Sequence, residues 1–243
     1  MILPFLPFPR LLLSGLLALS LGLPSITWAQ LPPIDITPAE TKLQAEQKAF
    51  TPILPYEQRD LNILLKKTWQ AYKQRLIQPD GRVLDPNARF VSTSEGQSYA
   101  MLRAVWMDDP QTFESAYRWS VNNLQKARGD KLFGWEWGQK PTGEWGLLHT
   151  ESASDADQDI ALALILAGKR WQNDFYLLEA QGTLNDLWER NTGDSPAGRV
   201  MYAGDWHQED SWLQTGKKYE LVNPSYLAPY AYRVFSEFDT NPD

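Results

Sequence analysis

The stretch Ala153–Trp171, ASDADQDIALALILAGKRW, carries the clearest structural signal in the chain. Residues 160–167 are all apolar, so a helix over this stretch is apolar around its whole circumference. Such a helix is stable only where it is buried on nearly every side. Three carboxylates, Asp155, Asp157 and Asp159, stand immediately before the apolar run. The stretch therefore predicts a buried helix whose N-terminal end is loaded with acidic groups.

These acids have two interpretations. In the first, Ser154 caps the helix, while Asp155 and Asp157 stabilise its positive end by about 0.3–1 kcal/mol each. In the second, the carboxylates do chemistry, because three acids are more than capping requires. A carboxylate at a helix N-terminus is held ionised, which suits a residue that stabilises a cationic transition state. Both interpretations remain open for Asp155 and Asp157.

A second stretch, STSEGQSYAM at 92–101, raises a similar question about Glu95. Glu95 follows Ser92 by three residues and precedes an apolar run, as the glutamate of a capping box does. However, Gly96 lets another group approach the backbone closely, and apolar neighbours favour a protonated carboxyl. Those neighbours are Tyr99, Met101, Leu102 and Trp106. Two carboxyls in contrasting environments are typical of acid–base chemistry on a glycosidic bond, so Glu95 is a candidate cap and a candidate proton donor.

Aromatic residues are frequent, with 11 tryptophans and 10 tyrosines. Several lie in or beside predicted loops rather than in helical stripes: Trp135, Trp137, Trp145, Trp206, Trp212 and Tyr226. A flat ring suits stacking against the C–H face of a sugar, whereas the alternative is that these rings cover the edge of the core. Nearby polar residues offer hydrogen bonds to sugar hydroxyls or simply form a solvated rim: Glu136, Arg199, Asp205 and Asp210.

The spacing of apolar residues indicates a mainly α class. Helical periods occupy about 57–78, 96–107, 110–124, 154–171, 175–190 and 225–238. The Gly- and Trp-rich segment 132–150 has no helical period and is expected to be a loop, and a short extended piece is expected at 199–203. Sustained alternation of the kind that marks a sheet is absent from the sequence. The domain is therefore expected to consist of consecutive helical hairpins joined by long loops.

The two N-terminal segments are expected to lie outside the domain. Residues 1–29 resemble a secretory signal peptide, with Arg10, a short apolar core and small residues before a cleavage site after Ala29. The mature protein is then secreted or periplasmic, without stable membrane insertion. Residues 30–54 form a Pro-rich lead-in, and the domain occupies 55–243.

Charge and composition exclude several classes of function. The chain has 23 Lys and Arg residues against 30 Asp and Glu residues, and no clustered basic face, so nucleic-acid binding is not expected. There is no cysteine, and the only histidines, His149 and His207, lack the spacing of metal ligands. No metal or other cofactor is therefore expected.

Four segments together resemble glycoside hydrolase family 8. Ala153–Trp171 fits the family signature, and STSEGQSYAM resembles its SEGQ(G/S)YGM segment, with Ala100 where Gly is common. LFGWEW at 132–137 resembles its LFxWxW loop, and NPSYLAPYAYR at 223–233 resembles its NPSYxxPxxYR segment. The resemblance implies an (α/α)6 barrel and inverting endo-hydrolysis of β-1,4-linked glycans, commonly cellulose.

The resemblance also implies roles for individual residues. Glu95 would protonate the leaving oxygen, and Asp155 would bind and help to distort the sugar at the point of cleavage. The substrate-binding candidates are Trp135, Trp137, Tyr226, Asp157 and Arg199.

One part of the family pattern is missing. The family's general base usually lies in a Tyr-Asp-Ala-x-Arg segment downstream of NPSY, and no such segment occurs before Asp243. The chain is therefore expected to hold roughly the first half to two-thirds of the barrel. The leading hypothesis is a secreted endo-β-1,4-glucanase, either for polysaccharide degradation or accompanying cellulose synthesis. The alternative is a non-catalytic or vestigial glucan-binding protein.

Overall fold

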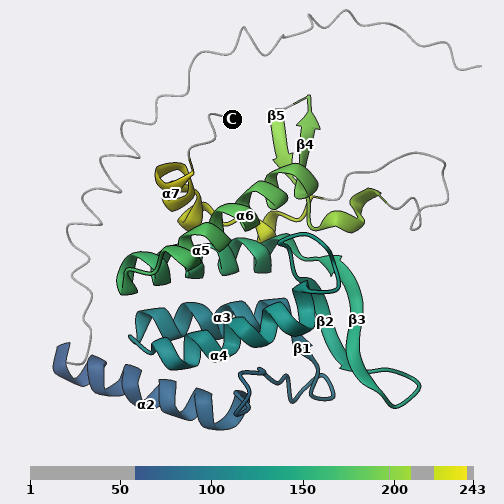
Figure 1. Ribbon diagram of the computed structural model, residues 1–243. Helices are drawn as coiled ribbons and strands as arrows, with labels where there is room; N and C mark the ends of the chain where they lie inside the picture. Colours follow the sequence, from purple (N-terminus) through teal and green to yellow (C-terminus); the bar gives the residue numbers. More distant parts are fainter. Residues whose placement is uncertain (1–57, 197, 209–221, 240–243) are drawn as a thin grey trace, which may run out of the picture. The chain divides into compact units, whose positions relative to one another are not determined.

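The computed structural model describes residues 58–196, 198–208 and 222–239 (Figure 1). All of them belong to one compact unit, Tyr56–Asp243. The predicted signal peptide and lead-in lie outside the described residues, as do Trp212 and Asp210. Within the described ranges, no helix combines the length and apolar character that a membrane crossing requires.

The class is mainly α, as predicted. The principal helices are α2 (Gln58–Leu76), α3 (Ser94–Trp106), α4 (Pro110–Ser120), α5 (Ser154–Trp171), α6 (Asp174–Asn191) and α7 (Pro229–Phe238). Shorter turns are the π-helical η2 (Val121–Gln125) and the 3-10 helices η3 (Asp205–Gln208) and η4 (Pro224–Tyr226). The single helix predicted at 225–238 is divided into η4 and α7, because Ala228 precedes a proline and has non-helical dihedral angles.

Two helical hairpins pack against each other to form the core (Figure 1). Helix α3 lies beside α5, and each is followed by its hairpin partner, α4 or α6. The partners meet through aromatic rings, with Phe113 of α4 edge-on to Tyr176 of α6 at 5.0 Å between ring centres. Helix α7 also contacts α5. Helix α5 is thus covered by α3, α6 and α7.

Helix α5 is buried as its sequence predicts. Residues 160–165 are all buried, with Ile160, Leu164 and Ile165 completely inaccessible. Each large apolar side chain of this kind contributes about 1.5–3 kcal/mol by leaving water. The prediction that Ser154 caps the helix is wrong: the N-cap is Ala153, without a side-chain cap. The Ser154 amide instead donates to the carbonyl of Ala203 at 3.0 Å.

The segment predicted as a loop at 132–150 is largely a β-hairpin. Strands β2 (Gly134–Gln139) and β3 (Trp145–Ser152) pair antiparallel, and the short β1 (Ser92–Thr93) extends the sheet in the order β1-β2-β3. The pairing has two register irregularities around Glu136. Such bulges break the period of two, which is why the sequence shows no clean alternation.

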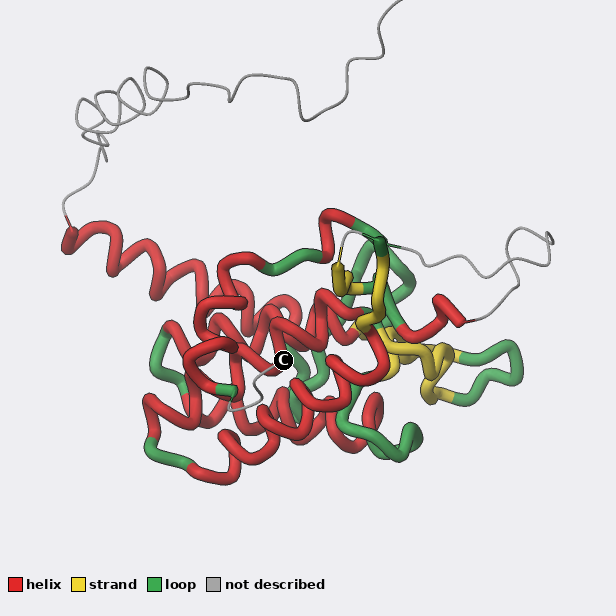
Figure 2. Tube along the Cα trace, turned by 90° about the horizontal axis from the view of Figure 1, so that it is seen from above, coloured by secondary structure: helices red, strands yellow, loops and turns green. Residues whose placement is uncertain are grey.

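A second hairpin joins β4 (Thr192–Ser195) to β5 (Gly198–Met201). It contains most of the predicted extended piece at 199–203. In Figure 2 the strands gather at one side of the helices.

A buried amide fixes α3 to its neighbours. Gln97, which is inaccessible to solvent, accepts a hydrogen bond from the Val83 amide at 2.6 Å. Its amide nitrogen donates to the carbonyls of Gly81 and Ala116 and to the Ser120 hydroxyl. Both ends of the side chain are satisfied, so Gln97 sets the position of α3 against α4 and the segment before β1.

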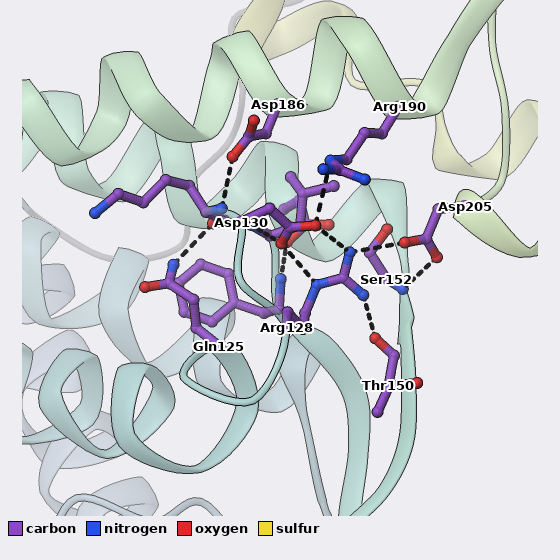
Figure 3. A network of polar contacts seen from close by, with 12 residues as sticks. Gln125, Arg128, Asp130, Thr150, Ser152, Asp186, Arg190 and Asp205 are labelled. Carbon is purple, nitrogen blue, oxygen red and sulfur yellow. Dashed lines mark hydrogen bonds and ion pairs between the residues drawn. The ribbon is translucent and has the colours of Figure 1, made fainter.

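A buried ion network ties the segment after η2 to the strands and to η3 (Figure 3). The Arg128 guanidinium donates twice to Asp130 at 2.9 Å and once to Asp205 at 2.7 Å, and it also binds the carbonyl of Thr150. Asp205 in turn accepts from the Ser152 amide at 2.8 Å. Burial opposes the charge on Arg128, but the two carboxylates outweigh it and raise the pKa of Arg128.

We expect Arg128→Leu to lower the free energy of unfolding by about 3–5 kcal/mol, because it leaves Asp205 without its cation and Asp130 with the longer, 3.3 Å pair to Arg190. The matched control is Arg118→Leu, which breaks the exposed pair with Glu114 on α4. Exposed pairs contribute little, so this variant should unfold almost like the wild type. Urea denaturation followed by circular dichroism measures both, and equal losses would contradict the assignment of the network as a stabilising element.

Candidate active site

A cavity of about 610 Å³ opens where the N-terminal ends of α3 and α5 meet the β-hairpin. Glu95 is the second residue of α3, and Asp155 is the second residue of α5. The cavity is lined by Thr93, Ser94, Glu95, Trp135, His149, Glu151, Ala153, Asp155, Trp206 and Tyr226. The structure therefore brings together five residues that the sequence singled out: Glu95, Asp155, Trp135, Trp206 and Tyr226.

Glu95 does not cap its helix. The N-cap of α3 is Thr93, whose hydroxyl accepts from the Gly96 amide at 3.0 Å. Ser92, the predicted cap, lies in β1, and its hydroxyl accepts instead from the Arg82 guanidinium at 2.8 Å. The carboxylate of Glu95 is thus free for another role.

The predicted apolar wall around Glu95 is not present. The Glu95 side chain is exposed, Met101 and Leu102 lie in the core, and Trp106 is itself 60% exposed. Tyr99 contacts Glu95, but through its hydroxyl, which donates to Glu95 Oε1 at 2.6 Å. The prediction failed because Met101 faces another side of α3, and Leu102 and Trp106 lie two and three turns further along it. Tyr99, four positions on, is close enough to lie over Glu95.

A second cavity of about 620 Å³ lies on the other side of Glu95. It is lined by α2 and by residues 83–87, and it shares Thr93 and Glu95 with the first cavity. Glu95 therefore stands between two hollows. A chain-like ligand has room on both sides of this carboxylate.

The pKa of Asp155 is shifted in the opposite direction to the one predicted. Burial raises its pKa to about 6, and the charges of Glu95 and Asp159 act in the same direction. The Ala156 amide donates to Asp155 Oδ1 at 2.8 Å and opposes the shift. The expected direction of the pKa shift was wrong because the loss of hydration is the larger effect, although a carboxyl with a pKa of about 6 is still mostly ionised at pH 7.

Asp159 and Tyr226 connect the site to the C-terminal segment. The Tyr230 hydroxyl of α7 donates to Asp159 Oδ1 at 2.6 Å, and burial raises the pKa of Asp159 despite this bond. Gln158 donates to the carbonyl of Tyr226 at 2.9 Å. Burial and the carboxylates of Asp155 and Glu95 raise the pKa of the Tyr226 phenol, which stays protonated as a hydrogen-bond donor.

One wall of the cavity is an aromatic stack. Trp135 lies parallel to His149, with ring centres 4.8 Å apart and an angle of 21°. His149 nitrogens lie 3.7 Å from Glu136 and 3.6 Å from Glu151. The sequence did not predict His149 or Glu151 as cavity residues, since their placement depends on the register of β3 against β2.

Asp157 is not a surface residue of the site. It is completely buried, and its Oδ1 accepts from the Phe133 amide at 3.0 Å. Burial raises its pKa well above the ordinary value. Its prediction as a substrate-binding residue is therefore wrong: it fixes the segment before β2 onto α5.

Trp137 and Arg199 also lie away from the Glu95 cavity. Trp137 packs edge-on against Trp119 with ring centres 5.4 Å apart, which braces the hairpin against the core. Arg199 on β5 stacks over Trp188 at 4.4 Å and lines a separate cavity of about 740 Å³. Neither residue lines the cavity that contains Glu95 and Asp155. The described residues also contain no cluster of three or more acidic or histidine side chains able to hold a metal ion.

Comparison with known proteins places this geometry in a family. Residues 53–243 match the profile of glycosyl hydrolases family 8. The chain is 35% identical to an endoglucanase of Salmonella typhi over 175 residues, which cover 70% of this chain and 45% of that protein. It is 42% identical over 125 residues to an endoglucanase of Pseudomonas fluorescens, covering 51% of this chain and 31% of that one. The chain thus spans less than half the length of these relatives.

Solved structures of endoglucanases are also similar to this chain. An endo-β-1,4-glucanase from Acetobacter xylinum superposes with a TM-score of 0.62 at 30% identity, covering 73% of this chain and 53% of that one. A family 8 endoglucanase from Klebsiella pneumoniae gives 0.61 at 31% identity, covering 72% and 53%. The family fold is an (α/α)6 barrel, of which the described helices form a part. Since the family profile covers most of its length, the chain belongs to glycosyl hydrolases family 8.

Proposed function

We propose that this chain acts on β-1,4-glucan as an exported endo-glucanase that inverts the anomeric configuration, with Glu95 as general acid. The observation that carries the proposal is the cavity where Glu95 and Asp155 meet beside aromatic rings. A second hollow beyond Glu95 supports cleavage within a chain rather than at its end. Export rests on the predicted signal peptide at 1–29.

The proton donor is assigned from the free oxygen of Glu95. Tyr99 occupies Oε1, so Oε2 carries the proton that passes to the glycosidic oxygen as the bond to the anomeric carbon breaks. The bonding electron pair leaves with that oxygen. A water then attacks the opposite face of the sugar and gives its proton to a base about 6.5–9.5 Å from the acid. The proposal assigns no residue to the base.

The remaining cavity residues hold the sugar. Trp135, Trp206 and Tyr226 offer ring faces, and the C–H face of a pyranose packs well on such planes. Asp155 lies among them and accepts hydrogen bonds from hydroxyls of the sugar at the point of cleavage. Ionised Asp155 also stabilises the positive charge that develops on the ring.

The biological setting follows from the substrate. An exported glucanase serves either to degrade polysaccharide outside the cytoplasm or to trim glucan during cellulose synthesis. Among the similar proteins is a probable endoglucanase of Novacetimonas hansenii. The proposal includes both settings, and the partner it requires is the glucan itself.

Glu95→Gln should lower kcat on carboxymethylcellulose by about 10²–10⁴-fold, because it removes the proton donor. The melting temperature should not fall, since the side chain is exposed, the isostere keeps its shape, and the repulsion of Asp155 and Asp159 by the Glu95 charge is removed. The control is Glu144→Gln, an exposed glutamate next to β3. Release of reducing ends measures the rate. Hydrolysis retained by Glu95→Gln would refute the assignment.

The same samples separate catalysis from binding. Wild-type protein that binds cellohexaose in calorimetry without releasing reducing ends would support the non-catalytic alternative. Absence of both binding and hydrolysis would refute the proposed substrate.

Trp135→Ala should weaken cellohexaose binding about fivefold or more, equivalent to about 1 kcal/mol, because a sugar loses its stacking plane. Trp145→Ala is the control, since Trp145 is 47% exposed on the same hairpin but does not line the cavity. Isothermal titration calorimetry compares the two dissociation constants. Equal effects of the two substitutions would mean that Trp135 acts through the hairpin and not through the sugar.

Asp155→Asn should be relatively more stable at pH 7 than at pH 4. In the wild type the Asp155 pKa is about 6 when folded, against about 4 when unfolded. Between these values the folded state binds the extra proton, so stability falls as pH rises and then levels off. Asn does not titrate, so the stability of the variant does not fall in this way as pH rises. Its melting temperature minus that of the wild type should therefore increase from pH 4 to pH 7, and a difference independent of pH would contradict the prediction.

A further inference from the structure

Tyr99 holds one oxygen of Glu95. It follows Glu95 by four residues on α3, and its hydroxyl donates to Oε1 at 2.6 Å. The ring is 51% exposed and lines the second cavity, so it is not a core residue whose hydroxyl found a partner by chance. We propose that Tyr99 is a positioning residue for the acid: it fixes Oε1, leaves Oε2 to carry the proton, and stabilises the carboxylate that remains after transfer. This inference rests on the proposed function of Glu95.

The charges around Glu95 explain why such a donor is needed. Asp155 and Asp159 on α5 both feel the charge of Glu95, which adds to the effect of burial in raising the pKa of each. Their carboxylates therefore oppose the negative charge that Glu95 acquires when it gives up a proton. Other titratable groups around the two cavities are His149, Glu151, Tyr226, Tyr72, Arg75 and Asp85. Among the residues that the structure describes, Tyr99 is the one whose side chain donates a hydrogen bond to the Glu95 carboxylate.

Tyr99 remains a donor throughout the neutral range. Its hydrogen bond to Glu95, together with burial and the nearby carboxylates, raises the pKa of the phenol well above its ordinary value. A donated hydrogen bond stabilises a carboxylate more than a carboxylic acid. During the transfer the Glu95 O–H bond breaks and the proton goes to the glycosidic oxygen, while the Tyr99 O–H bond stays intact. Tyr99 thus favours the product side of this step.

The test titrates Glu95 directly and does not require turnover. Full-length protein is labelled with ¹³C at glutamate side-chain carboxyls, and the Glu95 signal is assigned by its absence in Glu95→Gln. In Tyr99→Phe the titration midpoint of that signal should rise by about half a pH unit or more, because the carboxylate loses a donor. The matched control is Tyr176→Phe, which removes a phenol–carboxylate bond of 2.5 Å to Glu114, remote from the cavity. It should leave the Glu95 midpoint unchanged.

The outcomes separate this inference from the proposed function. An unchanged Glu95 midpoint in folded Tyr99→Phe overturns the role of Tyr99, whatever the activity. With measurable hydrolysis, Tyr99→Phe should lower kcat more than it changes KM and move the alkaline limb of the kcat profile upward. A fall in KM alone, or an unshifted limb, also overturns it. Failure of Glu95→Gln to abolish hydrolysis would instead refute the proposed function while leaving the NMR result valid.

Discussion

A buried guanidinium is the constraint on which the site depends. Arg128 leaves water together with Asp130 and Asp205, and its guanidinium is the cation that the two carboxylates share, with Asp130 also pairing with Arg190 at 3.3 Å (Figure 3). The segment before β2, the end of β3 and the η3 turn are therefore fixed as one unit. That unit carries Trp135, His149 and Trp206 to the wall of the cavity, so the aromatic surface owes its position to an ion network beneath it.

The carboxylates and the aromatic rings of the site come from different kinds of secondary structure. The N-terminal ends of α3 and α5 carry the carboxylates, whereas the rings come from the strands β2 and β3 and from the short turns η3 and η4. The carboxylates of Glu95, Asp155 and Asp159 repel one another, which disfavours folding at neutral pH. Phenols from α3 and α7 counter this by donating to Glu95 and Asp159. Groups of carboxyls with raised pKa values are typical of functional sites, which agrees with the proposed chemical role of these acids.

The sequence predicted what depends on local periodicity and missed what depends on contacts between distant segments. The burial of α5 followed from its apolar circumference, and the meeting of Glu95 with Asp155 followed from the family resemblance. The hairpin at 134–152 was missed because bulges erase its alternation. The pKa of Asp155 was predicted in the wrong direction because the dipole of α5 is local, whereas desolvation is caused by elements from elsewhere in the chain.

Asp155 and Asp157 show how one short motif serves two purposes. Two residues apart on a helix, side chains point in nearly opposite directions, so one acid faces the cavity while the other is sealed inside against Phe133. Under the proposed function, substitution at either position lowers activity, so a screen that scores only activity classes the two together. The yield of soluble protein distinguishes them, because Asp157 makes a buried contact of the fold whereas Asp155 lines the cavity.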